Sequence, residues 1–163
     1  MNFEQIWNIL ENELPKKIHS HHGLNLFIKN RSKFEGWLKV EICDILYKYS
    51  NNIVPEKNRI DIVFENWAIE LKTVNTNYKY NGINNKTKPI TKNILSVLKD
   101  IRDLKLNTHY EHKIVIFIVF PLSSSNVIWI KHKTKIENML KVLKYKEFQF
   151  NNNINSILYC GLV

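Results

Sequence analysis

The chain has 163 residues, 44% of them hydrophobic and 24% charged, which is enough for one globular domain with a buried core. Its 24 lysines and arginines exceed its 15 aspartates and glutamates, and the net charge of +9 at pH 7 favours a polyanionic partner such as nucleic acid. Two cysteines without a paired spacing exclude a disulfide framework, and four glycines without a glycine-rich motif argue against nucleotide binding by a P-loop or Rossmann fold.

Neither the N-terminal segment nor the longest apolar run indicates secretion or a membrane. Residues 1–17 are acidic and polar from the start, unlike a signal peptide. The apolar run at 114–122 is too short to span a bilayer, and its β-branched residues favour a strand. We therefore expect a cytoplasmic protein with no membrane partner.

The first third of the chain predicts two helices. Apolar residues recur at helical spacing from Phe3 to Leu10, and Pro15 is expected to end that helix. Residues 16–33 are polar and predict an irregular connection. A stronger apolar stripe from Phe34 to Tyr49 predicts the second helix.

The middle of the chain predicts strands. A short strand at 53–54 precedes two longer ones at about 59–65 and 67–74, which a turn centred on Glu65 and Asn66 joins into a hairpin. The asparagine-rich segment 75–89 predicts a long loop.

The remaining pattern completes an α/β domain. It predicts a helix over 91–106 and a strand over 114–120 whose unbroken apolarity is typical of a sheet covered on both faces. We further expect a short strand at 123–130, a basic amphipathic helix at 133–146 and a closing strand at 157–163. Together these elements predict a single domain, residues 1–163, with a central mixed β-sheet of at least four strands flanked by α-helices.

Three charged residues interrupt the two long apolar strands. Strand alternation places Glu70 and Lys72 on one face, and the expected turn pairs Asp61 directly with Glu70, with Cβ atoms about 5 Å apart. Two like charges at that distance repel by roughly 3 kcal/mol at an effective dielectric constant of about 20. Lys72 could neutralise one carboxylate, whereas a divalent ion such as Mg²⁺ or Mn²⁺ could neutralise both. The alternative is an exposed sheet face with ordinary solvated charges.

The pattern Asp61-x8-Glu70-Leu71-Lys72 lies between a helix that carries glutamates and a following helix and buried strand. This arrangement, over residues 35–119, resembles the PD-(D/E)xK nuclease superfamily and implies a restriction-endonuclease-like core. The sequence departs from the family pattern in having Ile60 before the aspartate. A Pro55–Glu56 pair stands five residues earlier.

The resemblance implies a metal-dependent endonuclease that hydrolyses phosphodiester bonds, with DNA as the expected substrate. Asp61, Glu70 and the backbone carbonyl of Leu71 would bind Mg²⁺, with Mn²⁺ as an alternative ion and Glu56 as a rival or additional ligand. Lys72 would orient or help to deprotonate the attacking water and stabilise charge on the phosphate.

Family members often supply a further glutamate from the preceding helix, and this helix offers Glu35 and Glu41. Glu41 has the better heptad relation to Phe34 and Leu38. Glu35 begins the helix, where a carboxylate also suits the helix dipole without any metal. We therefore expect Glu41 to support the site and leave Glu35 as the alternative.

Basic and aromatic residues after the second charged strand suit phosphate contact and base stacking. A solvated loop of low complexity is the alternative. The nucleic-acid-binding candidates are Lys79, Lys86, Lys88, Lys92, Tyr78 and Tyr80.

Two other functions compete with a DNA nuclease. One is a non-catalytic nucleic-acid-binding or assembly module with the same fold, and the other is an RNA-cleaving toxin domain. The complete set of Asp61, Glu70 and Lys72 favours catalysis, because a binding module does not need the lysine. The chain leaves little room for a separate sequence-reading domain, so we expect specificity for DNA structure, or specificity supplied by a homodimer or a partner protein.

Overall fold

A six-stranded mixed sheet organises the fold, which comes from a computed structural model that describes residues 1–85, 89–122 and 125–163. The strands are β1 (Ile53–Lys57), β2 (Ile60–Phe64), β3 (Trp67–Asn75), β4 (His112–Phe120), β5 (Val142–Gln149) and β6 (Asn155–Leu162). Their order in the sheet is β1-β2-β3-β4-β6-β5. The helices are α1 (Phe3–Ser20), α2 (Leu24–Lys29), α3 (Glu35–Tyr47), α4 (Thr91–Leu106) and α5 (Val127–Glu137). The predicted α/β class with a mixed sheet flanked by helices is confirmed.

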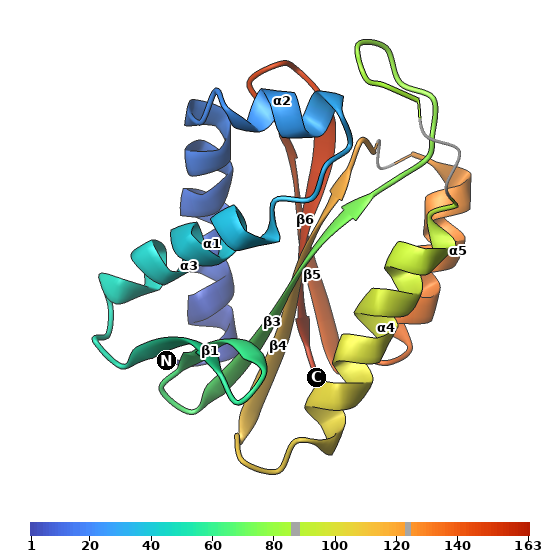
Figure 1. The fold of residues 1–163 in the computed structure, drawn as a ribbon. Coiled ribbons are helices and arrows are strands. Elements are labelled where there is room, and N and C mark those ends of the chain that lie inside the picture. The colour runs from blue at the N-terminus through green and yellow to red at the C-terminus, as the bar shows by residue number, and fades with distance from the viewer. Residues whose placement is uncertain (86–88, 123–124) are drawn as a thin grey trace.

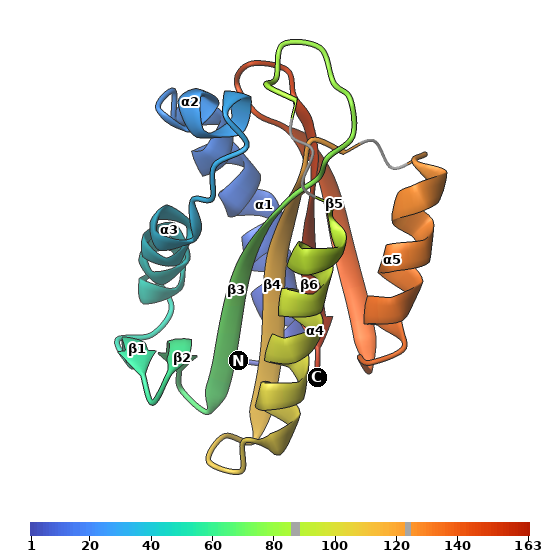
Figure 2. The same ribbon diagram turned by 45° about the vertical axis from the view of Figure 1, so that its right-hand side comes forward.

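Strand β4 lies inside the sheet and is buried on both faces, as its unbroken apolarity predicted. Ile114, Ile116 and Ile118 belong to the core under α1 and α3, whereas Val115 and Phe117 belong to the core under α4 and α5. Figures 1 and 2 show these two helix pairs on opposite faces of the sheet. Strand β4 pairs in parallel with β3, and α4 forms the crossover between them.

The predicted end of the first helix at Pro15 is wrong, because α1 continues to Ser20 with Pro15 inside it. Leu10, Leu14 and Ile18 are fully buried at intervals of four residues. This continuous apolar stripe lies on the core and outweighs the unfavourable proline, which costs about 3 kcal/mol in a helix interior. The segment 16–33, predicted to be irregular, contains the end of α1 and the short helix α2.

The elements expected at 123–130 and 133–146 are also wrong in the described residues. Residues from Val127 form α5, and the side chain of Asn126 caps this helix by accepting hydrogen bonds from the amides of Ile128 and Trp129. Residues from Val142 form the edge strand β5, which pairs with β6 along its whole length. Backbone pairing with β6 therefore outweighs the helical periodicity of this segment.

Among the helices in the described ranges, none combines the length and the apolarity needed to cross a membrane.

Replacing Ile116 by Ala tests the central position of β4. Its side chain is fully buried, so the loss of apolar contacts and the remaining cavity should lower the free energy of unfolding by about 2–5 kcal/mol. The melting temperature should fall by about 2–4 °C for each kcal/mol. The matched control is Ile128→Ala on α5, where the side chain is 58% exposed and little change is expected. Equal losses in the two variants would contradict the fold.

Candidate active site

The β2–β3 hairpin has the predicted register. Phe64 pairs with Trp67, and the ladder continues through Ile62 and Ile69. The next step of this register brings Asp61 opposite Glu70, and the two carboxyl groups lie close enough for each to shift the pKa of the other. The predicted convergence of the two acidic residues is therefore present in the structure.

The site lies where β3 loses its neighbour on one side. The ladder with β2 ends at Ile69, so later backbone groups on that edge need other partners. The amide of Leu71 donates to Asp61 Oδ2 at 2.9 Å, and the amide of Thr73 donates to Glu35 Oε1 at 3.0 Å. Two carboxylates therefore bind the open edge of β3 at alternate residues, about 6.7 Å apart along the strand.

The structure brings Glu35, and not Glu41, to this edge. Glu41 Oε2 lies 2.7 Å from Nζ of Lys17 on α1. The two glutamates are separated by about 120° around α3, since each residue turns a helix by about 100° and they are six residues apart. The heptad relation that favoured Glu41 did not identify the residue that faces the sheet, because α3 packs against both α1 and the sheet and each flank of its apolar stripe finds a partner. The preference for Glu41 is therefore corrected in favour of Glu35.

Lys72 is held from the other side of β3 by a residue that the sequence analysis missed. Its Nζ lies 2.8 Å from Oδ2 of Asp100 on α4, and the two side chains are only 17% and 13% exposed. Burial opposes the charged form of the lysine, but the Asp100 carboxylate outweighs it and raises the pKa of Lys72. Asp100 lies between the buried Val97 and Leu104 on the inner face of α4. A charged residue within the apolar stripe of this helix was the feature of the sequence that could have identified Asp100.

Lys39 is a second residue that the sequence analysis missed. Its Nζ lies 2.8 Å from Asp61 Oδ1 and 2.9 Å from Glu56 Oε1. Glu56 is 76% exposed, and its contact with the site is the ion pair with Lys39. This contact does not bring its carboxylate to the metal position that was predicted for it. Lys39 follows Glu35 by four residues on the same helix face, which was the available signal. Helices α3 and α4 lie on the two sides of β3 and contribute the charged partners of the site, Lys39 and Asp100 (Figure 2).

Burial and the facing carboxylate give Asp61 and Glu70 opposite protonation behaviour. Burial and the neighbouring Asp61 raise the pKa of Glu70 to about 8. Burial would also raise the pKa of Asp61, but Lys39, the Leu71 amide and the Glu70 carboxyl outweigh it and lower that pKa. At neutral pH the pair therefore holds one proton, which lies on Glu70.

The donor set at the strand edge fits a magnesium ion that keeps some of its water. No group of three or more histidine, cysteine, aspartate or glutamate side chains suited to a metal ion occurs within the described ranges. Proteins nevertheless commonly bind Mg²⁺ through one or two carboxylates and leave its other positions to water and substrate phosphate. Asp61 provides one carboxylate, and Glu70 provides a second when it releases its proton, as a metal ligand must. The Leu71 carbonyl faces the same edge as the amide that binds Asp61, since both groups of a strand residue point towards one neighbour.

The candidates for nucleic-acid contact have different environments. Lys79 and Lys92 are exposed, so a phosphate group could reach both side chains. Tyr78 and Tyr80 are half-buried against the two cores, and the Tyr80 hydroxyl accepts a hydrogen bond from the amide of Asn155. Packing thus already uses these rings, which were expected to stack on bases. Lys86 and Lys88 lie outside the described residues.

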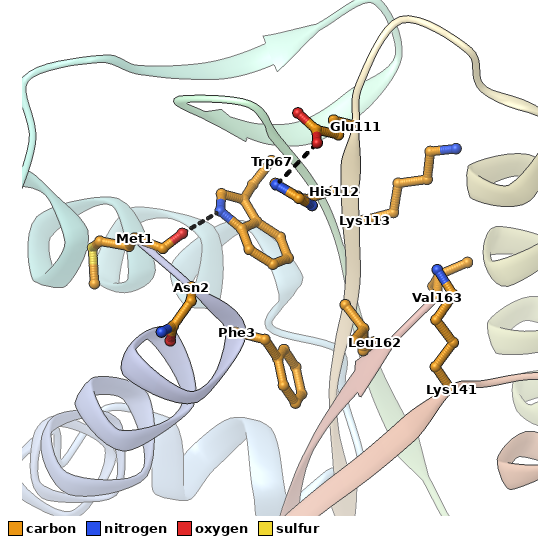
Figure 3. Close-up of a pocket in the computed structure, with 10 residues that line it drawn as sticks. All are labelled: Met1, Asn2, Phe3, Trp67, Glu111, His112, Lys113, Lys141, Leu162 and Val163. Atoms are coloured by element: carbon orange, nitrogen blue, oxygen red, sulfur yellow. Dashed lines mark hydrogen bonds and ion pairs between the residues drawn. The ribbon is translucent and has the colours of Figure 1, made fainter.

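A separate pocket of about 310 Å³ lies at the start of β3, beside Trp67 (Figure 3). The rings of Trp67 and His112 are 4.6 Å apart there, and the indole N–H donates to the backbone carbonyl of Met1 at 3.1 Å. Asp61, Glu70 and Lys72 do not line this pocket, so it is not part of the candidate active site.

The raised pKa of Glu70 predicts that the protein loses stability as the pH rises. An ordinary glutamate has a pKa of 4.5, so between that pH and about 8 the folded state holds a proton that the unfolded chain has released. The contribution of Glu70 to the free energy of unfolding should therefore be highest below about pH 4.5. It should fall by an amount on the order of a few kcal/mol by about pH 8. Glu70→Gln should remove this pH dependence. Urea unfolding from pH 5 to 9 in EDTA measures both variants.

The control for this experiment is Glu147→Gln, on the exposed face of β5. It should keep the pH dependence of the wild type. Equal pH dependence in the wild type and in Glu70→Gln would contradict the protonated pair.

Asp100→Asn should destabilise the fold, because it leaves the half-buried ammonium of Lys72 without its counter-ion. We expect the free energy of unfolding to fall by about 1–3 kcal/mol at pH 7. Asp103→Asn is the matched control on the same helix, since Asp103 forms an exposed ion pair with Lys99 and should contribute little. Thermal and urea denaturation compare the two variants, and equal effects would show that the Lys72–Asp100 pair has no special role.

Comparison of the chain with protein-family models, with curated proteins and with solved structures gave no match. The function is therefore inferred from the positions of the charged residues at the open edge of β3.

Proposed function

We propose that the protein is a metal-dependent nuclease that hydrolyses phosphodiester bonds, with DNA as the expected substrate and a restriction-endonuclease-like core. The observation that carries this proposal is the convergence of Asp61 and Glu70 at the open edge of β3, with Lys72 on the face of β3 that Glu70 shares. The position of Glu35, two residues further along the same edge, supports it. The basic net charge of +9 suits a polyanionic substrate.

In this proposal the acidic residues bind the metal ion and Lys72 binds the phosphate. Asp61, Glu70 and the Leu71 carbonyl would hold Mg²⁺, and Glu35 would support them through a water molecule. The bound ion supplies a water molecule of lowered pKa and screens the charge of the phosphate. Lys72 is kept as an ammonium by Asp100, so its role is to orient the scissile phosphate and stabilise the negative charge that develops on it, rather than to accept a proton.

A non-catalytic nucleic-acid-binding module is the competing proposal, and one observation favours it. The ammonium of Lys39 already lies against Asp61, where it neutralises a carboxylate that a metal ion would otherwise bind. For catalysis, Lys39 must give way to the ion or share the carboxylate with it.

A nuclease assay on duplex, single-stranded and branched DNA and on RNA, with Mg²⁺ or with EDTA, distinguishes the two proposals. We expect cleavage that requires Mg²⁺ and that falls by at least about 100-fold in Asp61→Asn and in Lys72→Ala, because each removes charge stabilisation at the reacting phosphate. Glu35→Gln should lower the rate by about 10-fold or more, as loss of a residue supporting a metal site commonly does.

The matched control is Glu41→Gln, on the same helix but paired with Lys17, which should stay within about twofold of the wild type. Cleavage that persists in EDTA or in Lys72→Ala would contradict the site. A folded wild type that binds DNA but cleaves none of the substrates would favour the binding module.

A further inference from the structure

A pocket of polar and basic side chains lies where β3 ends, beyond the candidate active site. Its volume is about 390 Å³. Three segments form it: the connection between α2 and α3, the last residue of β3, and the first turn of α4 together with Pro89 just before it. The lining includes Arg31, Ser32, Lys33, Asn75, Lys92 and Asn93, and none of the described residues that line the pocket is acidic.

Hydrogen bonds between these three segments build the wall of the pocket. Asn75 Nδ2 donates to the Arg31 carbonyl at 2.9 Å, and Asn93 Nδ2 donates to the Asn75 carbonyl at 2.8 Å. The guanidinium of Arg31 is fully buried and donates to the backbone carbonyls of Thr76 and Tyr78. The pocket is thus formed before any ligand arrives, which reduces the ordering that binding requires.

The charged groups at the mouth of this pocket are available to an anion. Lys92 is exposed and forms no ion pair with any part of the chain that the structure describes. Lys33 lies 3.4 Å from Glu35 Oε1, and both side chains of this pair are substantially exposed, so the pair is weak. Two lysines, a buried arginine and the side-chain amides of Asn75 and Asn93 thus line a positively charged recess.

The recess follows the same strand as the candidate active site. Asn75 lies three residues after Lys72, a distance of about 10 Å along β3. At a rise of about 3.4 Å per nucleotide along the axis of B-form DNA, and with the backbone winding around that axis, this distance spans only a few nucleotides. A strand whose scissile phosphate lay at Lys72 would therefore have another phosphate within reach of Lys33 and Lys92.

We propose that this pocket binds a backbone phosphate of the nucleic-acid substrate, a few nucleotides from the scissile bond, through Lys33 and Lys92. The inference rests on the proposed function for the identity of its ligand. Contacts to phosphate position a nucleic acid without reading its sequence. The pocket therefore sets where the strand lies on the protein, and the residues at the open edge of β3 act on it.

Binding of a fluorescently labelled DNA duplex, measured by anisotropy in EDTA at several salt concentrations, tests this inference without cleavage. Each lost phosphate contact should reduce the slope of log affinity against log salt by about one. We expect Lys92→Ala to lower the slope by about one and the double variant Lys33→Ala/Lys92→Ala by about two, for duplexes of any sequence.

Lys105→Ala is the matched control, because Lys105 is also exposed and lies on α4 about 20 Å from Lys92. It removes the same charge and should leave the slope nearly unchanged. Circular dichroism and melting temperature confirm that each variant is folded. Equal losses in Lys92→Ala and Lys105→Ala would overturn the inference, because they would show binding by overall charge alone.

The outcomes separate this inference from the proposed function. Mg²⁺-dependent cleavage by a protein in which Lys92 and Lys105 are equivalent would overturn the pocket and leave the nuclease. Binding that depends on Lys92, in a protein that cleaves nothing, would support the pocket and overturn the nuclease. A folded wild type that binds neither DNA nor RNA would overturn the pocket.

Discussion

The unequal pairing of the two edges of β3 is the constraint on which the candidate site depends. Strand β4 pairs with β3 along its whole length, whereas the ladder with β2 ends at Ile69. The backbone groups left on the open edge need partners, and the carboxylates of Asp61 and Glu35 accept hydrogen bonds from the Leu71 and Thr73 amides. The same requirement that satisfies the backbone therefore brings acidic groups together.

Bringing these groups together places several charges in a half-buried site, and the protein neutralises them in three ways. Glu70 keeps a proton, Lys39 pairs with Asp61, and Lys72 pairs with Asp100. Each solution neutralises one half-buried charge, and loss of one partner of either ion pair would leave the other charge buried and unpaired. Perturbed pKa values of this kind cluster at functional sites, which supports the proposal of a site that binds a cation and a phosphate.

Much of the fold could be predicted from the sequence where local patterns decide it. The helix over 91–106 has a full apolar stripe, and the strand that contains Ile116 is apolar throughout, so helical and strand periodicity were sufficient. The errors occur where tertiary contacts outweigh local preference. Pro15 remains inside α1 because buried residues continue on both sides of it. Residues from Val142 form a strand because β6 offers a complete set of backbone partners.

The candidate site divides in the same way. Strand alternation and a tight turn determined from the sequence alone that Asp61, Glu70 and Lys72 come together, because side-chain direction in a hairpin follows from the register. Only the tertiary structure decided that Glu35 joins them instead of Glu41, and that α3 and α4 supply their charged partners. Those contacts depend on which face of each helix packs against the sheet. That packing is determined by contacts between residues far apart in the chain, and the spacing of residues within one segment does not reveal such contacts.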